Sequence, residues 1–180
     1  MQAPAWTMAG LGFTATLAGF AKLPSNILSF LGGPLSGWLS QRYSVRLPIM
    51  IGGFMAAAGW ILGMSLPNTL MQMIALLCLI SFGTTLLNAA LPIVIVSAAP
   101  ADRTSEAIGT MSVIRGMCAA VGTQLIALAL ASDMVKAPDG GASFPSPAGY
   151  HLTMLVIAAL SVAAGLTGLL LRKPRAKAAA

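Results

Sequence analysis

Five apolar runs of 20 to 29 residues dominate this chain and constrain its fold more than any other feature. Each run is long enough to cross the roughly 30 Å hydrocarbon core of a bilayer as an α-helix. Because the runs do not alternate between apolar and polar residues, helices are predicted rather than strands. The sequence therefore predicts an all-α, polytopic transmembrane helix bundle of about five spans, at residues 18–40, 47–66, 70–98, 107–131 and 152–171.

Composition excludes an ordinary soluble domain. Hydrophobic types make up 57% of the residues and charged types 8%, whereas a soluble domain carries about 25% charged residues. So few charges cannot cover a surface that faces water, and membrane lipid is the expected surrounding. Residues 1–17 are expected to form the outer end of a preceding span and an outer loop. The five-span membrane domain occupies residues 18–171, and residues 172–180 form a basic cytoplasmic tail.

The basic residues are distributed unequally between the two ends of the predicted spans. With the loop at 41–46 in the cytoplasm, the other loops alternate, and two lysines lie on the outer side: Lys22 near the outer end of the first span, and Lys136 in a loop. The excess of basic residues on the cytoplasmic side predicts an outer N-terminus and a cytoplasmic C-terminus. The formal net charge of +6 then suits an anionic leaflet, and no nucleic-acid partner is predicted. The cytoplasmic set is Arg42, Arg46, Arg103, Arg172, Lys173, Arg175 and Lys177.

A ten-residue stretch between the first two runs, GWLSQRYSVR at 37–46, resembles the short-loop motif of the major facilitator superfamily. Gly37, Arg42 and Arg46 match that motif, as does the leucine at position 39. Gln41 stands where the family usually has aspartate, and Ser44 where it has a second glycine. Such a degenerate copy is typical of the repeat of this motif between the eighth and ninth spans of the family.

The surrounding sequence carries the same resemblance from about residue 5 to residue 172. The segment 12–24 is similar to the start of the eighth span in drug-efflux-like members, and the segment 100–122 is similar to the loop and start of the eleventh. This mapping implies the eighth to twelfth spans of a twelve-span transporter, or the late spans of a fourteen-span one, in a bacterial-type inner (plasma) membrane. It implies efflux of small organic molecules by proton antiport, with an N-terminal half or a second chain as a required partner.

Four residues of the motif-like loop are candidates for a cytoplasmic gate: Gly37 for close helix approach, and Gln41, Arg42 and Arg46 for polar contacts. The alternative is that the two arginines are positive-inside anchors. A neutral amide at position 41 can form hydrogen bonds but no charge pair, so a gate contact there should be weaker than in the family.

Arg115 is the charge placed well inside a predicted span, nine residues beyond Glu106. A charge at that depth is costly and should face protein or water. Two interpretations stay open: a contact to substrate or gate, and a structural arginine that reaches Glu106 or Asp102. Three mid-span amides are possible cavity-lining residues or interhelical contacts, because amides in hydrocarbon need partners: Asn26, Asn88 and Gln124.

No nucleophile–base pair, phosphate-binding glycine loop or cluster of metal ligands occurs in the sequence. Enzyme activity, catalytic residues, a metal and a cofactor are therefore not predicted. The alternative to a transporter fragment is a self-sufficient five-span subunit for membrane interaction or assembly, without transport. A stable homo-oligomer that lacks any further partner would identify it.

Overall fold

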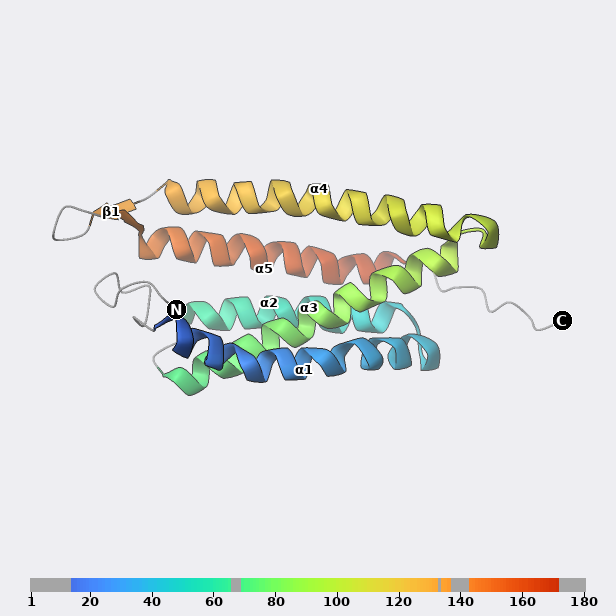
Figure 1. Ribbon diagram of the computed structural model, residues 1–180, viewed down its shortest axis with the longest axis horizontal. Helices are drawn as coiled ribbons and strands as arrows, with labels where there is room; N and C mark the ends of the chain where they lie inside the picture. Colours follow the sequence, from blue (N-terminus) through green and yellow to red (C-terminus); the bar gives the residue numbers. More distant parts are fainter. Residues whose placement is uncertain (1–13, 66–68, 133, 137–142, 172–180) are drawn as a thin grey trace.

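The computed structural model describes residues 14–65, 69–132, 134–136 and 143–171. Helices that follow one another along the chain run roughly antiparallel (Figure 1). The first 13 residues and the predicted basic tail at 172–180 lie outside the described residues. The helices are α1 (Ala15–Arg42), α2 (Arg46–Ser65), α3 (Leu70–Ala98), α4 (Thr104–Ala131) and α5 (Pro147–Leu170). The predicted all-α polytopic bundle is thus confirmed.

Four of these helices are long and apolar enough to cross a membrane: α2, α3, α4 with its preceding turn, and α5. Helix α1 has the length, at 28 residues, but not the apolar character, among the residues searched. Its polar content explains this, because Lys22, Asn26 and several serines interrupt the apolar sequence. A helix of this kind suits a position against protein or a polar cavity better than one surrounded by lipid.

Hydroxyl side chains begin three of the helices. Thr14 accepts a hydrogen bond from the backbone N–H of Leu17, and Thr69 one from Gln72, as N-cap residues do. Ser146 accepts one from the N–H of Gly149, and the following residue, Pro147, occupies the first turn of α5, where its missing N–H costs nothing. A short helical turn (η2, Ala101–Arg103) precedes α4.

The connector between α4 and α5 contains a short pair of strands. Strands β1 (Met134–Lys136) and β2 (Ser143–Pro145) pair antiparallel, with Val135 opposite Phe144. Helix α5 starts at Pro147, five residues before the predicted span at 152–171. The local Ser-Pro cap accounts for the early start, because it stabilises helix independently of hydropathy.

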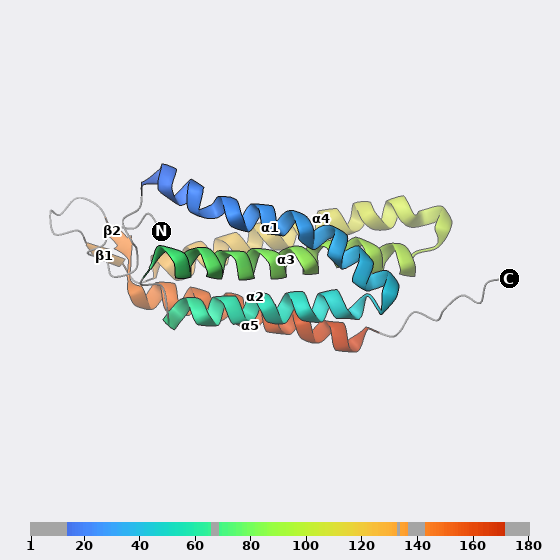
Figure 2. The same cartoon turned by 90° about the horizontal axis from the view of Figure 1, so that it is seen from below.

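The helices form a curved row in the order α1, α3, α2, α5, α4. The most extensive contacts join α2 to α5, α2 to α3, and α1 to α3. Figure 2 shows α1 and the N-terminal part of α4 toward one side of the molecule, with α2 and α5 toward the other. Helix α2 is therefore the central element, and α1 and α4 are the two edges.

Small residues make the closest interhelical contacts, as expected where lipid provides no hydrophobic drive between helices. Gly52 faces α3, because a Cβ built on it would lie 2.5 Å from the carbonyl oxygen of Gly83. Its neighbour Gly53 faces α5 and lies against Gly165. The buried Ser36 on α1 donates its hydroxyl hydrogen bond to the backbone oxygen of Leu86 on α3, at 3.1 Å.

Candidate functional site

A groove of about 600 Å³ lies between the C-terminal half of α3 and the N-terminal half of α4. Residues of α4 that recur every three or four positions form one wall, since they share a helix face. Leu91 and Ile95 of α3 form the opposite wall. The lining is mostly apolar, and its polar members are Arg103, Glu106, Thr110 and Arg115.

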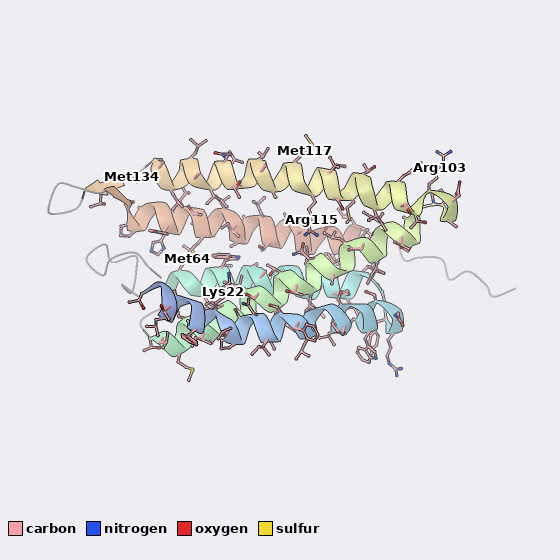
Figure 3. The ribbon with its side chains drawn as sticks, in the orientation of Figure 1. Lys22, Met64, Arg103, Arg115, Met117 and Met134 are labelled. Carbon is pink, nitrogen blue, oxygen red and sulfur yellow. The ribbon has the colours of Figure 1, made fainter. Side chains whose placement is uncertain are left out.

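Arg115 lines the end of this groove that is farther from the η2 turn. It lies 11 residues after the start of α4, or about 16 Å along a helix that rises 1.5 Å per residue. Figure 3 shows its side chain pointing from α4 toward the neighbouring helices, whereas Arg103 and Met117 point away from the bundle. Arg115 as a residue is exposed within the described structure.

The acidic residues nearest in sequence do not pair with Arg115. Asp102 contacts Arg103, with 3.8 Å between its Oδ2 and the arginine Nε, and both side chains are exposed. Glu106 lines the same groove, in the first turn of α4. Within the described residues no ion pair joins it to Arg115. The structural arginine of the sequence interpretation, held by Glu106 or Asp102, thus has no supporting contact here.

The three candidate amides have different environments. Asn88 lines a cavity of about 200 Å³ between α2, α3 and α5, and its Nδ2 donates to the carbonyl oxygen of Thr84 at 2.8 Å. Asn26 on α1 and Gln124 on α4 have exposed side chains without a hydrogen bond to another described residue. All three amides are thus exposed, and Asn88 is distinguished by lining a cavity between three helices.

The motif-like loop is a tight turn between α1 and α2. The backbone N–H groups of Tyr43 and Ser44 both donate to the carbonyl oxygen of Leu39, which ends α1. The Ser44 hydroxyl then accepts from the N–H of Arg46 at 3.1 Å, at the start of α2. Serine in place of the family's second glycine thus takes part in a hydrogen bond that orders the turn.

The four gate candidates lie around this turn, and no side-chain hydrogen bond or ion pair joins them to one another among the described residues. Gln41 and Arg42 are exposed in the last turn of α1. Gly37 is half-buried, with open space where a Cβ would stand. Arg46 is half-buried, and its Nε is buried without a hydrogen-bond partner among the described residues. An unpaired buried donor is costly, which marks Arg46 as a side chain available to another partner.

Two features of the site were missed from the sequence. Glu106 was considered as a partner for Arg115 and not as a lining residue of a groove. A second, apolar groove of about 310 Å³ between α4 and α5, lined in part by Gly122, Leu125 and Val156, was not expected either. Both grooves depend on which helices pack beside α4. The sequence of α4 itself does not indicate its neighbours.

Comparison with known families agrees with these features. The family model for the Major Facilitator Superfamily matches residues 1–180, which is the whole chain. Neither the curated proteins nor the solved structures contain a match. A family match over the full length, together with a bundle of apolar helices, identifies the broad class. The chain belongs to the Major Facilitator Superfamily and is an integral membrane protein of a secondary-transporter family, not of an enzyme family.

Proposed function

We propose that this chain supplies the eighth to twelfth spans of a drug-efflux-like transporter, or the equivalent late spans of a longer one. The transporter exports small organic molecules by proton antiport. The chain does not transport alone but needs a complementary half, on the same polypeptide or on a second one. The single observation that carries this proposal is the state of α4, which lies at the edge of the bundle with little protein against it.

Burial of α4 contrasts with that of the central helix. In the most apolar window of the α4 span none of the residues is buried, whereas 39% are buried in the corresponding window of α2. A Cβ on Gly109, Gly116 or Gly122 of α4 would meet nothing within 4 Å. Exposed leucine and valine are compatible with lipid contact alone, but glycines in a membrane helix typically mark close helix packing. Helix α4 thus offers a packing surface without an occupant.

Helix α1 offers a similar surface at the other edge. Gly33 and Gly37, four residues apart, also have open space where a Cβ would stand. Since α1 and part of α4 lie toward one side of the bundle (Figure 2), a second helical body could contact both. Substrate sites in transporters of repeated halves lie near the membrane midplane, between the halves. The groove with Arg115 opens beside one of these edges.

The efflux direction and the proton coupling rest on the resemblance to drug-efflux members. Asp102 and Glu106 lie at one end of α4 rather than at mid-membrane depth. We therefore expect the coupling carboxylate in the complementary half. The membrane orientation is also a proposal. The end of α1, the start of α2 and the start of α4 lie at the end of the bundle where α5 finishes (Figure 1). Arg42, Arg46 and Arg103 belong to these helix ends, which supports a cytoplasmic position for that end of the bundle.

Co-expression in bacteria tests this function. Cells would express the chain with the N-terminal six-span half of a related efflux transporter, and efflux of one fluorescent organic cation and one fluorescent organic anion would be recorded. We expect efflux of at least one dye above the empty-vector level, and its loss when a protonophore collapses the proton gradient. Loss of efflux in Gly116→Leu, with activity retained in Gly63→Leu, would assign the α4 surface to pairing, because a Cβ at either position meets no described residue within 4 Å.

The opposite outcome is equally informative. No gain over empty vector for either dye, together with a stable homo-oligomer in detergent, would favour the self-sufficient interaction or assembly subunit. Efflux that persists in the presence of the protonophore would support transport by the chain but contradict coupling by proton antiport.

A further inference from the structure

The charges along the α3–α4 groove are arranged unevenly with depth. At the end near the η2 turn, Asp102 and Arg103 form an ion pair and Glu106 adds a negative charge. Arg115 lies nine residues beyond Glu106, about 13 Å farther along α4. The end of the groove nearer the middle of α4 therefore carries one positive charge that no described residue compensates.

An uncompensated guanidinium at this depth requires an anion or water. Arginine carries a permanent positive charge, and its planar donors match the two oxygens of a carboxylate, sulfonate or phosphate. In membrane helices such a residue faces the protein interior or a water-filled cavity, where it pairs with a counter-charge. The direction of the Arg115 side chain, toward the neighbouring helices, agrees with this position (Figure 3).

The rest of the groove suits an apolar body rather than a bare ion. Leu91 and Ile95 from α3 face Met111 and Ile114 from α4 across it. Its volume of about 600 Å³ falls in the range of roughly 300–1,000 Å³ that is typical of small-molecule sites. A carboxylate on an adjacent helix would neutralise Arg115 without needing this space.

We propose that the groove binds a small organic anion with an apolar body, and that the Arg115 guanidinium binds its anionic head group. The inference rests on the proposed transport of small organic molecules and names their chemical class. The apolar walls hold the body, Arg115 holds the head, and Glu106 at the mouth disfavours a second negative charge there. A monoanionic amphiphile is thus preferred to a dianion and to an organic cation.

A binding experiment tests this site without requiring transport. The purified chain would be placed in nanodiscs of zwitterionic phosphatidylcholine and titrated calorimetrically with three probes of the same shape. These are naphthalene-2-sulfonate, the neutral naphthalene-2-sulfonamide and the cationic 2-naphthylmethylammonium, with empty nanodiscs subtracted. We expect saturable binding that is strongest for the sulfonate. Arg115→Gln should weaken sulfonate binding by roughly 10-fold or more, because a charge-assisted bidentate contact is lost.

Matched variants separate the site from general charge effects. Lys22→Gln removes the same charge from α1, and Lys22 does not line the groove; its sulfonate affinity should equal that of the unmodified chain. Arg115→Gln should leave the sulfonamide affinity unchanged. Should Arg115→Gln lose its helical circular dichroism, Ile95→Trp provides a second test from the α3 side, because it fills the groove and should weaken both sulfonate and sulfonamide.

Several results would overturn the proposal. The anion site would be refuted if folded Arg115→Gln bound the sulfonate as tightly as the unmodified chain does. It would also be refuted if the unmodified chain bound the cationic probe more tightly than the sulfonate. Loss of sulfonate binding when phosphatidylglycerol replaces part of the phosphatidylcholine would assign the guanidinium to a lipid head group instead. The dye assay keeps the two proposals apart: efflux of the organic cation without sulfonate binding leaves the transporter standing and refutes the anion site. Sulfonate binding without efflux of either dye supports the anion site and refutes the proposed transport.

Discussion

Gly53 of α2 and Gly165 of α5 meet backbone to backbone: a Cβ built on Gly53 would lie 2.5 Å from the Cα of Gly165. The preceding residue, Gly52, makes the equivalent approach to Gly83 of α3. Successive residues of a helix point about 100° apart, so two adjacent glycines can admit two different neighbours. This pair explains how α2 packs closely against both α3 and α5.

Replacing Gly53 by alanine should destabilise the chain. The new methyl group meets backbone atoms, which cannot rotate away, so we expect a loss of about 1–3 kcal/mol in the free energy of unfolding. Gly63→Ala on the same helix is the control, since its Cβ would meet nothing within 4 Å, and it should change stability by less than about 1 kcal/mol. Unfolding in detergent, followed by circular dichroism, measures both; equal effects would contradict the close α2–α5 contact.

Ser36→Ala tests the buried hydrogen bond between α1 and α3. Removing the hydroxyl leaves the Leu86 carbonyl without this donor, and interhelical hydrogen bonds in membranes contribute on average about 0.6 kcal/mol, with a maximum near 1.7. Ser40→Ala is matched to it, because the Ser40 hydroxyl bonds within α1, to the carbonyl of Ser36. The same unfolding assay should show a loss for Ser36→Ala only. A larger loss in Ser40→Ala would be inconsistent with the described packing.

Membrane orientation is measurable by cysteine labelling in whole cells. After replacing Cys78 and Cys118 with alanine, single cysteines would be introduced at Val135 and Gln41, which are exposed at opposite ends of the bundle. The proposed orientation predicts that an impermeant maleimide labels Val135→Cys in intact cells. It should label Gln41→Cys only after permeabilisation. The reversed pattern would place the basic loop outside.

Arg46→Met separates a structural role from a gating one. The buried Nε has no partner among the described residues, and an unsatisfied donor costs about 1–3 kcal/mol, so its removal should leave stability unchanged or raise it. Efflux by the co-expressed transporter should fall if Arg46 makes a gate contact with the other half. Arg42→Met, at an exposed site, is the stability control. A clear loss of stability in Arg46→Met alone would make it an anchor of the chain itself.

The sequence predicted the helices well where hydropathy and capping signals coincide. The third predicted run and α3 share the bounds Leu70–Ala98, because Thr69 caps the start and Pro100 follows the end. The start of α5 at Pro147 was missed, since the Ser-Pro cap lies within a proline- and glycine-rich connector that hydropathy marks as a loop. The short β1–β2 pairing was missed for the same reason.

Interhelical contacts were harder to predict. Gly33 and Gly37 have the spacing of a packing motif, but a Cβ on either would meet nothing within 4 Å among the described residues. Gly52 and Gly53, which have no such spacing, lie close to the backbones of neighbouring helices. Helices that are apolar on every face have no periodicity that identifies the buried side. For the same reason Asn88 could not be distinguished from Asn26 and Gln124, and the depth of Arg115 was predictable while its groove was not.

The helices differ in length, and the short central helix α2 limits the membrane thickness that the bundle can match without tilting its longer helices. Helix α2 has 20 residues, or about 30 Å, while α3 has 29, or about 44 Å. With its glycine contacts fixing α3 and α5 against it, α2 cannot slide to suit a thicker membrane. The longer helices must then tilt or project into the headgroup region, as α3 does by crossing the bundle obliquely (Figure 1). Membrane thickness should therefore act on this protein first through the tilt of α3.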